Sequence, residues 1–519
     1  MIIFLSQLIL VMCDKNMTFE ECELSILRNA VDHIENKQGK KKLSDPEIKK
    51  IIEIVENFLK STKRMCYGGT AINNLLPKND QFYNKDVELP DYDFFSPNPV
   101  QDAKNLANIY YKEGYEEVEA KAGMHAGTFK VFVNFIPVAD ITYLVPEIYN
   151  KLFKTAPKVD GIYYCDATFL RMAMYLELSR PDGDISRWEK VLKRLSLLNK
   201  HYPMRGKNCD METIQRLFQY GSKTELKGGK KKKKKSEVDL EDEDLFLKTT
   251  EEKIFHNLRE TLINQGCVFF GSYANRMYLK NLKHLRRKKI PRVPDFDVLS
   301  EESDKCSRIV KERLESIGIK NISIVNHEKI GEIIPKHCEI RVAKETIAFI
   351  YEPLECHSYN NVNIDGRSIK IASLDTMLSL YLAFLYSNRP YYDENRILCM
   401  SEFLFRVQQK NRLSQHGILK RFSSDCYGHQ HTREAIRSEK TKKFHELRNK
   451  PKGKDWDWWF LKFRPGEKKT KKSTKRTKKK TNKKNRRKTK NKKKRNKKKK
   501  TRKRRKKSRR RRRKKFSFF

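Results

Sequence analysis

Hydrophobic and polar residues alternate with two different periods along the first half of the chain. Apolar residues fall on one helical face in segments 45–59, 100–111 and 166–178, the first of which opens with Asp45 and Pro46. Shorter runs rich in β-branched and aromatic residues predict strands at 65–68, 91–95, 128–135 and 138–145. A short helix is expected at 70–76, after a glycine turn. This pattern predicts an α+β fold in which a mixed β-sheet is flanked by helices.

The same order of motifs occurs twice, which indicates an internal duplication. Three matches recur in order at offsets of 203 to 209 residues. They pair Cys66–Asn73 with Phe269–Arg276, Pro90–Phe94 with Pro294–Val298, and the stretch from Asp166 to Arg180 with that from Asp375 to Arg389. A period near 200 residues is far longer than that of a solenoid repeat, so we predict two tandem homologous domains.

Two strongly charged segments suggest the domain boundaries. Lys227–Asp244 joins a polylysine run to an acidic run, and like charges in a block cannot build a core, so a flexible linker is expected. The tail from Lys468 holds 36 Lys and Arg up to Lys515 with no acidic residue, and should be disordered. The predicted divisions are an extension (1–40), a catalytic domain (41–225), a linker (226–248), a degenerate second domain (249–462) and the basic tail (463–519).

Composition excludes several classes of protein. The 519 residues carry a formal charge of +49, but without the tail 78 basic residues face 65 acidic ones, so the body is only moderately basic. No apolar run is long enough for a membrane helix, and the apolar start lacks the preceding basic residue of a signal peptide. The eleven cysteines contain no CxxC pair, which favours reduced thiols in a cytosol-like compartment. Cys426, His429 and His431 lack a second ligand pair, so a surface loop is expected there rather than a zinc site.

Asp91 and Asp93 are the first candidates for chemistry. Residues two apart on a strand project from one face, and their carboxylates repel unless a cation lies between them. A hard cation such as Mg²⁺ takes oxygen ligands of this kind. The alternative is a solvated loop, because an aspartate after a proline such as Pro90 commonly forms a turn.

Asp140 strengthens the metal interpretation. It lies in the nearly apolar segment 136–144, where a carboxylate is costly to bury unless it is paired or metal-bound. It could instead face water on a half-exposed strand. Three carboxylates on neighbouring strands can hold two Mg²⁺ ions about 3.5–4 Å apart.

Gly68 and Gly69 provide a candidate phosphate site. A glycine turn between a strand and a helix lets backbone N–H groups approach phosphate oxygens, although most such pairs are simply turns. Thr70 could donate to a phosphate oxygen or could cap the following helix.

Together these motifs resemble a known family. Gly68-Gly69, Asp91-x-Asp93 and Asp140 resemble the nucleotidyltransferase signature of the polymerase-β-like superfamily. The wording CYGGTAINNLL, LPDYDFFS and FIPVADITYL resembles the poly(A) polymerase catalytic subunits of large DNA viruses, the poxvirus and giant-virus group, with similarity over about residues 40–410.

The resemblance implies a template-independent enzyme that adds AMP from ATP to RNA 3′ ends in mRNA polyadenylation. Asp91 and Asp93 would bind two Mg²⁺ or Mn²⁺ ions, and Asp140 would bind the ion that activates the RNA 3′-OH. Gly68, Gly69 and Thr70 would hold the triphosphate. A homodimer without a membrane association, acting in the host cytoplasm at the viral factory and packaged in the virion, is also implied.

The second block departs from the signature. Gly271, Asp295 and Asp297 remain, but the best match to 137–140 is 353–356, which places Cys356 where Asp140 stands. We therefore expect a degenerate domain that supports structure and binds RNA. A basic stretch is the candidate RNA contact, although a solvated loop fits equally: Arg286, Arg287, Lys288 and Lys289.

Two other functions fit part of the pattern. A DxD metal-dependent glycosyltransferase would explain Asp91 and Asp93 but neither the glycine turn nor Asp140. A non-catalytic RNA-binding scaffold would leave the carboxylates without a role. The basic tail can bind polyanions by counterion release and could hold RNA near an active site, or serve as a nuclear address.

Overall fold

The computed structural model describes residues 17–43, 45–83, 90–210, 213–216, 237–282, 293–364, 366–450 and 453–467. The chain divides into two compact units, Met1–Phe463 and Arg464–Phe519, and the description below concerns the first. Within the described residues, no helix has both the length and the hydropathy to cross a membrane. Most of the predicted basic tail, and the candidate RNA contact at 286–289, lie outside the described residues.

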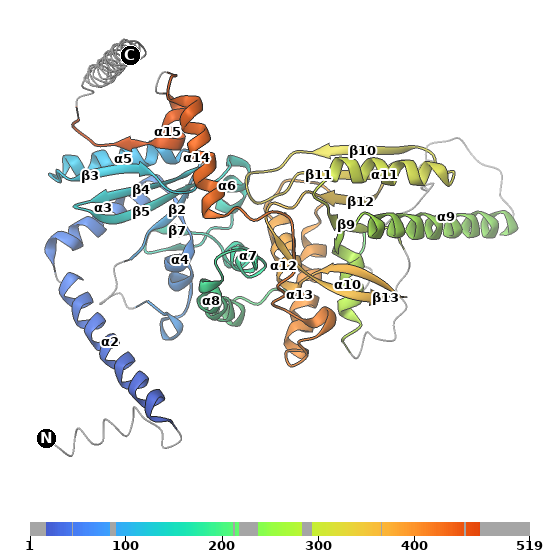
Figure 1. Ribbon diagram of the computed structural model, residues 1–519, viewed down its shortest axis with the longest axis horizontal. Helices are drawn as coiled ribbons and strands as arrows, with labels where there is room; N and C mark the ends of the chain where they lie inside the picture. Colours follow the sequence, from blue (N-terminus) through green and yellow to red (C-terminus); the bar gives the residue numbers. More distant parts are fainter. Residues whose placement is uncertain are drawn as a thin grey trace, which may run out of the picture. The chain divides into compact units, whose positions relative to one another are not determined.

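The first half of the chain, joined by one strand from residues 462–463, builds a mixed eight-stranded sheet (Figure 1). Its strands, in spatial order, are β16 (Lys462–Phe463), β3 (Val118–Ala122), β4 (Thr128–Val133), β5 (Ile136–Tyr143), β2 (Asp93–Ser96), β1 (Met65–Cys66), β7 (Ile162–Tyr164) and β6 (Lys158–Val159). The helices of this half are α2 (Phe19–Leu43), α3 (Pro46–Thr62), α4 (Gly68–Leu75), α5 (Pro99–Lys112), α6 (Pro146–Phe153), α7 (Ala167–Leu178) and α8 (Trp188–His201).

Local signals explain where these helices begin. The side chain of Asp45 accepts a hydrogen bond from the Glu47 N–H and caps α3, and Pro46 occupies the first turn, where its missing N–H costs nothing. Asp166 caps α7 in the same way by accepting from the Phe169 N–H. Helices α3 and α5 bury their apolar faces against the sheet, which confirms the helical periods predicted for them.

The second half builds another mixed eight-stranded sheet. Its spatial order is β10 (Ile322–His327), β11 (His337–Val342), β12 (Glu345–Tyr351), β9 (Phe296–Leu299), β8 (Val268–Phe270), β14 (Arg367–Ala372), β13 (His357–Ile364) and β15 (Cys426–Tyr427). Its helices are α9 (Glu237–Asn264), α10 (Gly271–Leu279), α11 (Ser303–Ser316), α12 (Leu374–Phe384) and α13 (Glu394–Lys410).

Seven strands of each sheet share one topology. The run β3-β4-β5-β2-β1-β7-β6 matches β10-β11-β12-β9-β8-β14-β13 in order. The pairs β2–β5 and β9–β12 are both parallel, as are β1–β7 and β8–β14, while the remaining pairs are antiparallel in both sheets. The α+β fold with two mixed sheets flanked by helices is confirmed, and the glycine and DxD motifs of the two halves occupy equivalent places in it.

Two segments differ from the predicted domain divisions. Helix α9 begins at Glu237, so part of the expected linker 226–248 is helical. The chain also returns to the first sheet at its end: after α14 (Arg433–Leu447) and α15 (Lys454–Phe460), strand β16 pairs with β3. Trp458 packs edge-on against Phe129 and Tyr143, which anchors this return. Residues 454–463 therefore complete the first sheet rather than the second domain, a long-range pairing that no local pattern announces.

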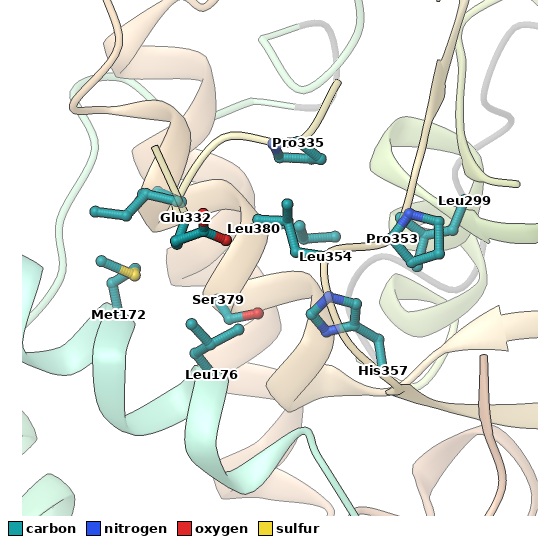
Figure 2. A pocket seen from close by; sticks show the side chains of 12 residues that line it. Met172, Leu176, Leu299, Glu332, Pro335, Pro353, Leu354, His357, Ser379 and Leu380 are labelled. Atoms are coloured by element: carbon teal, nitrogen blue, oxygen red, sulfur yellow. The ribbon is translucent and has the colours of Figure 1, made fainter. Parts of the chain in front are cut away.

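The two halves pack through α7 and α12, which lie side by side between the sheets in Figure 1. The Tyr386 hydroxyl donates to Asp166 Oδ1 at 2.6 Å, and the Ser358 N–H donates to the Ser179 carbonyl at 2.8 Å. Figure 2 shows a mostly apolar pocket at this junction, to which α7 contributes Met172 and Leu176.

Disulfide bonds correct the expectation of reduced thiols. Cys209 is disulfide-bonded to Cys399, and Cys356 to Cys426, across 190 and 70 residues of sequence. Tertiary structure brings these partners together, so their spacing gave no CxxC signal. Five buried cysteines in the described residues remain free thiols: Cys66, Cys165, Cys267, Cys306 and Cys338.

Candidate active site

A glycine corner joins β1 to α4. Gly68 begins α4 with φ +72°, a left-handed conformation that favours glycine. A Cβ atom at this position would lie 2.8 Å from Asp93 Oδ2, closer than real side chains approach. The corner thus combines a helix N-terminus with direct contact between the backbone and a candidate carboxylate.

The strand register brings Asp140 beside Asp93. These residues are direct partners on the parallel strands β5 and β2, so their side chains share one face of the sheet. The Asp140 N–H donates to the Tyr92 carbonyl at 3.1 Å, which continues the pairing toward Asp91. Asp91 lies just before β2 and acts electrostatically on both Asp93 and Asp140, so the three carboxylates lie near one another beside the glycine corner.

The three carboxylates lie close enough to repel one another. Burial raises the pKa of Asp93 to about 7, and the neighbouring Asp91 and Asp140 contribute to this rise. The pKa of Asp91 is also raised, first by burial and then by Asp140. A cluster of hard oxygen donors whose charges repel one another suits divalent cations such as Mg²⁺ or Mn²⁺. Assignment of these residues as metal ligands stays a prediction.

Lys130 is a site residue that the sequence analysis missed. It lies opposite Asp140 on the antiparallel strand β4, and its Nζ pairs with Asp140 Oδ2. Its charge also lowers the pKa values of Asp91 and Asp93 against the effects that raise them. Only knowledge of the β4–β5 register would have found it, because Lys130 has no motif of its own.

A row of basic residues on α8 faces the same site. Lys190 acts electrostatically on Asp91, and Arg187, just before the helix, acts on Asp93. Arg194, one turn after Lys190, donates to the Tyr83 hydroxyl at 2.7 Å and lies over the Phe82 ring at 4.7 Å.

Tyr83 and Arg194 also lie beside the glycine corner. A Cβ at Gly69 would overlap the Tyr83 hydroxyl and would lie 3.0 Å from the Arg194 guanidinium. The Asn73 side chain holds this arrangement by accepting the N–H groups of Phe82 and Tyr83, each at 2.8 Å. The 187–190–194 spacing, typical of one helical face, was the available signal for these residues.

Thr70 has a different role from the one expected. Its buried hydroxyl donates to the Asp91 carbonyl at 2.7 Å, and the N-cap position of α4 belongs to Tyr67. Thr70 therefore neither caps the helix nor presents a free hydroxyl to phosphate. It fixes the loop that carries Asp91, which is a positioning contact.

The register also corrects the counterpart of Asp140 in the second domain. Asp297 on β9 is the direct partner of Phe349 on β12, so Phe349 occupies the place that Asp140 has in the first sheet. Cys356 lies beyond the end of β12 and forms the disulfide with Cys426. The expected match of 137–140 with 353–356 was wrong. It relied on a similar composition of proline and apolar residues, whereas the strand register identifies the equivalent positions. By the same criterion, Ser373, the N-cap of α12, corresponds to Asp166 rather than Asp375.

Comparisons with known proteins agree with the expected family resemblance. Residues 53–184 match the family model described as "Poly(A) polymerase catalytic subunit", and this segment contains the glycine corner and all three carboxylates. A "putative poly(A) polymerase catalytic subunit" of Acanthamoeba polyphaga mimivirus is 36% identical over 162 residues. That of African swine fever virus (strain Badajoz 1971 Vero-adapted) is 33% identical over 169 residues.

These alignments cover 30% and 32% of this chain, and 27% and 36% of the two viral proteins, so the matched segment spans about a third or less of each relative. A solved structure, "Crystal structure of the Megavirus polyadenylate synthase", has the same fold over 84% of both chains, with a TM-score of 0.66 and 19% sequence identity. The fold likeness therefore extends across both halves of the chain, whereas the sequence likeness concentrates on the candidate site.

Proposed function

We propose that this chain is the catalytic subunit of a viral poly(A) polymerase, which adds AMP from ATP to RNA 3′ ends without a template. The observation that carries the proposal is the convergence of Asp91, Asp93 and Asp140 beside Gly68, within the segment that matches the family. A glycosyltransferase with a DxD motif accounts for two of these four residues.

Each residue has a distinct task in the proposed reaction. Asp91 and Asp93 would hold two divalent cations, which would supply charge neutralisation of the triphosphate and a lower pKa of the RNA 3′-OH. Asp140 would hold the cation on the 3′-OH side and accept the proton of that hydroxyl. The bond from the 3′ oxygen to the α-phosphorus forms as the bond to the pyrophosphate oxygen breaks.

The positive charges of the chain complete the proposed site. The N–H groups at the start of α4 face the triphosphate, and Arg194 and Lys190 compensate its negative charge from α8. Lys130 pairs with Asp140, and a cation held by Asp140 would compete with this ion pair.

Primer extension tests the proposal directly. The purified chain is incubated with a 5′-labelled RNA oligonucleotide and each nucleoside triphosphate in turn, with Mg²⁺ or Mn²⁺, beside the Asp140→Ala variant. We expect growth of the primer with ATP, and no growth with the variant. A wild-type chain that binds the RNA without extending it would support the scaffold alternative, and hydrolysis of a nucleotide sugar would support the glycosyltransferase.

The basic tail is proposed to retain RNA between successive additions. Its 36 Lys and Arg bind polyanions without reading sequence. A chain that ends at Glu467 should add shorter tails per binding event and show a weaker salt dependence. Unchanged processivity at all salt concentrations would refute this role.

A homodimer and a location in the host cytoplasm, with packaging in the virion, complete the proposal. Light scattering of the purified chain tests the dimer. The Cys209–Cys399 and Cys356–Cys426 disulfides are relevant to the proposed location, because disulfide bonds are rare in a reducing cytosol. Thiol alkylation of protein taken from infected cells and from virions, followed by mass spectrometry, separates the two compartments.

A further inference from the structure

The second domain keeps the glycine–carboxylate corner of the first. Gly271 has φ +67°, and a Cβ there would overlap Asp297 Oδ2, just as Gly68 contacts Asp93. Asp295 and Asp297 are 1% and 5% exposed, so both carboxylates are more deeply buried than their counterparts. Two buried, neighbouring carboxylates are stable only when a positive charge compensates them.

Arg216 supplies that charge. Its Nη2 lies 2.5 Å from Asp295 Oδ1 and its Nη1 lies 3.2 Å from Asp297 Oδ1, so one guanidinium bridges both carboxylates. The Arg216 backbone N–H also donates to Asp295 Oδ2 at 2.8 Å. Arg396 on α13 pairs with the same oxygen at 2.9 Å. A planar guanidinium with several donors suits this bidentate position better than lysine would.

Phe349 also distinguishes this corner from the corner of the first domain. Where the first sheet offers the Asp140 carboxylate, the second offers an aromatic ring, and the Arg216 guanidinium carbon lies 4.6 Å from its centroid. The ring face attracts a guanidinium but offers no oxygen ligand to a divalent cation. The absence of a third aspartate and the presence of the Arg216 guanidinium therefore both disfavour a divalent cation at this corner.

Arg216 reaches the site on a strap that leaves the first domain after α8. This strap, residues 204–210 and 213–216 of the described chain, runs along α13. The Gly206 N–H donates to Glu402 Oε2 at 2.9 Å, the Cys209–Cys399 disulfide fixes its middle, and the carbonyl of the buried Ile214 accepts from Arg396 Nε at 3.2 Å. Covalent and polar anchors thus hold Arg216 in place.

We propose that Asp295 and Asp297 form a latent divalent-cation site, whose built-in occupant is the Arg216 guanidinium. While Arg216 is in place, its guanidinium excludes a metal ion from this corner of the second domain. The equivalent corner of the first domain has no such arginine among the described residues and is the candidate cation site. This proposal does not depend on the reaction assigned to the first domain.

Removal of the guanidinium tests the proposal. The Arg216→Met variant keeps much of the side-chain length without the charge, and it is made in an Asp91→Asn/Asp93→Asn background that removes two candidate ligands from the first domain. Mn²⁺ binding is measured by electron paramagnetic resonance, and thermal unfolding is followed with and without Mn²⁺. We expect Arg216→Met to bind one additional Mn²⁺ per chain and to unfold at a higher temperature when Mn²⁺ is present. No additional binding and no response to Mn²⁺ would overturn the proposal.

A companion variant covers the case in which Arg216→Met does not fold. Arg216→Met/Asp297→Asn removes the carboxylate that would lose its partner and leaves Asp295 paired with Arg396, so it should fold without metal and bind no additional Mn²⁺. If this companion were as unstable as Arg216→Met alone, charge compensation would not be the task of Arg216 and the proposal would fail. Arg205→Met, an exposed arginine of the same strap, is the matched control and should change neither readout.

Discussion

Asp93 and Asp140 stand opposite each other on neighbouring parallel strands, although 47 residues separate them in sequence. Their pairing puts two carboxylates on one face of the sheet, beside a glycine that tolerates no side chain. In the second domain the same two positions hold Asp297 and Phe349. At this corner the two halves therefore differ in the residue that faces the second aspartate, and the first cluster suits cations while the second already contains an arginine.

The first prediction concerns Asp140. Asp140→Asn keeps the size of the side chain but removes a charged ligand and the proposed proton acceptor. We expect primer extension to fall by about 100-fold or more, the scale on which loss of one transition-state contact acts. RNA binding, measured by fluorescence anisotropy, should change little.

Asp160→Asn is the matched control, because Asp160 is an exposed aspartate of the same domain, away from the site. It should leave extension intact. If Asp140→Asn extended primers as well as Asp160→Asn did, the carboxylate cluster would not be the catalytic centre.

The second prediction concerns the glycine corner. Gly68→Ala places a methyl group 2.8 Å from Asp93 Oδ2 at a left-handed backbone position. The conformation itself should cost about 1–2 kcal/mol of stability. Displacement of the Asp93 carboxylate should lower primer extension by about 100-fold, since a shift of about 1 Å at a reacting centre has effects of that size.

Gly114→Ala separates these two effects. Gly114 has φ +97°, and its methyl group would meet no other atom within 4 Å, so the substitution carries the backbone strain without the collision. Thermal unfolding should shift comparably in both variants, whereas only Gly68→Ala should lose activity per folded molecule. Equal activity of the two variants would contradict the proposed contact.

Local patterns in the sequence were enough to predict the elements that carry the site. Asp45 and Asp166 cap helices where their positions suggested, whereas the strand predicted at 91–95 begins at Asp93 and leaves Asp91 in the turn before it. These features depend on neighbours within a few residues. The convergence of Asp140 with Asp93 was also predictable, because a lone carboxylate in an apolar strand needs a reason to be there.

Contacts between distant segments could not be predicted in this way. The exchange of Asp140 for Phe349 follows from strand register, and a shift of a few residues in an apolar stretch leaves the composition unchanged. Arg216 meets its carboxylates after 79 residues of chain, and β16 pairs with β3 after more than 300. Neither Arg216 nor β16 has a recognisable sequence motif, because the role of each depends on a contact with a distant segment.

The third prediction tests the basic row on α8. Arg194→Met should remove the charge beside Gly69, together with the guanidinium that lies over Phe82, while an unbranched apolar side chain of similar length remains. A charged hydrogen bond to phosphate contributes about 1.5–3 kcal/mol, so the KM for ATP should rise by about tenfold or more. The KM for RNA primer should change little.

Lys193→Met is the control for this change. Lys193 is the adjacent residue of α8, its side chain is 74% exposed, and it pairs with Glu189. Steady-state kinetics with varied ATP should leave this variant near wild type. A KM for ATP that responded equally to both variants would mean that the charge of the helix as a whole, and not its inward row, attracts the nucleotide.

The last prediction concerns His357, which lines the pocket at the junction of the two halves (Figure 2). Burial lowers the pKa of His357 to about 3, and the nearby Arg180 guanidinium contributes to this fall. Glu332 also lines this pocket, at its exposed side. The imidazole therefore stays neutral in the folded chain, while in the unfolded chain it takes up a proton near its ordinary pKa of about 6.5.

Because the unfolded state binds the extra proton, acidification favours unfolding. From about pH 6.5 downward to the folded-state pKa, this one histidine should lower the free energy of unfolding by about 1.4 kcal/mol per pH unit. His357→Gln cannot take up that proton, so urea unfolding at pH 7 and pH 5 should show a smaller loss of stability in the variant, by about 2 kcal/mol. His416→Gln, at an exposed histidine, should keep the wild-type pH dependence. A wild-type slope in His357→Gln would show that the acid sensitivity of the chain arises elsewhere.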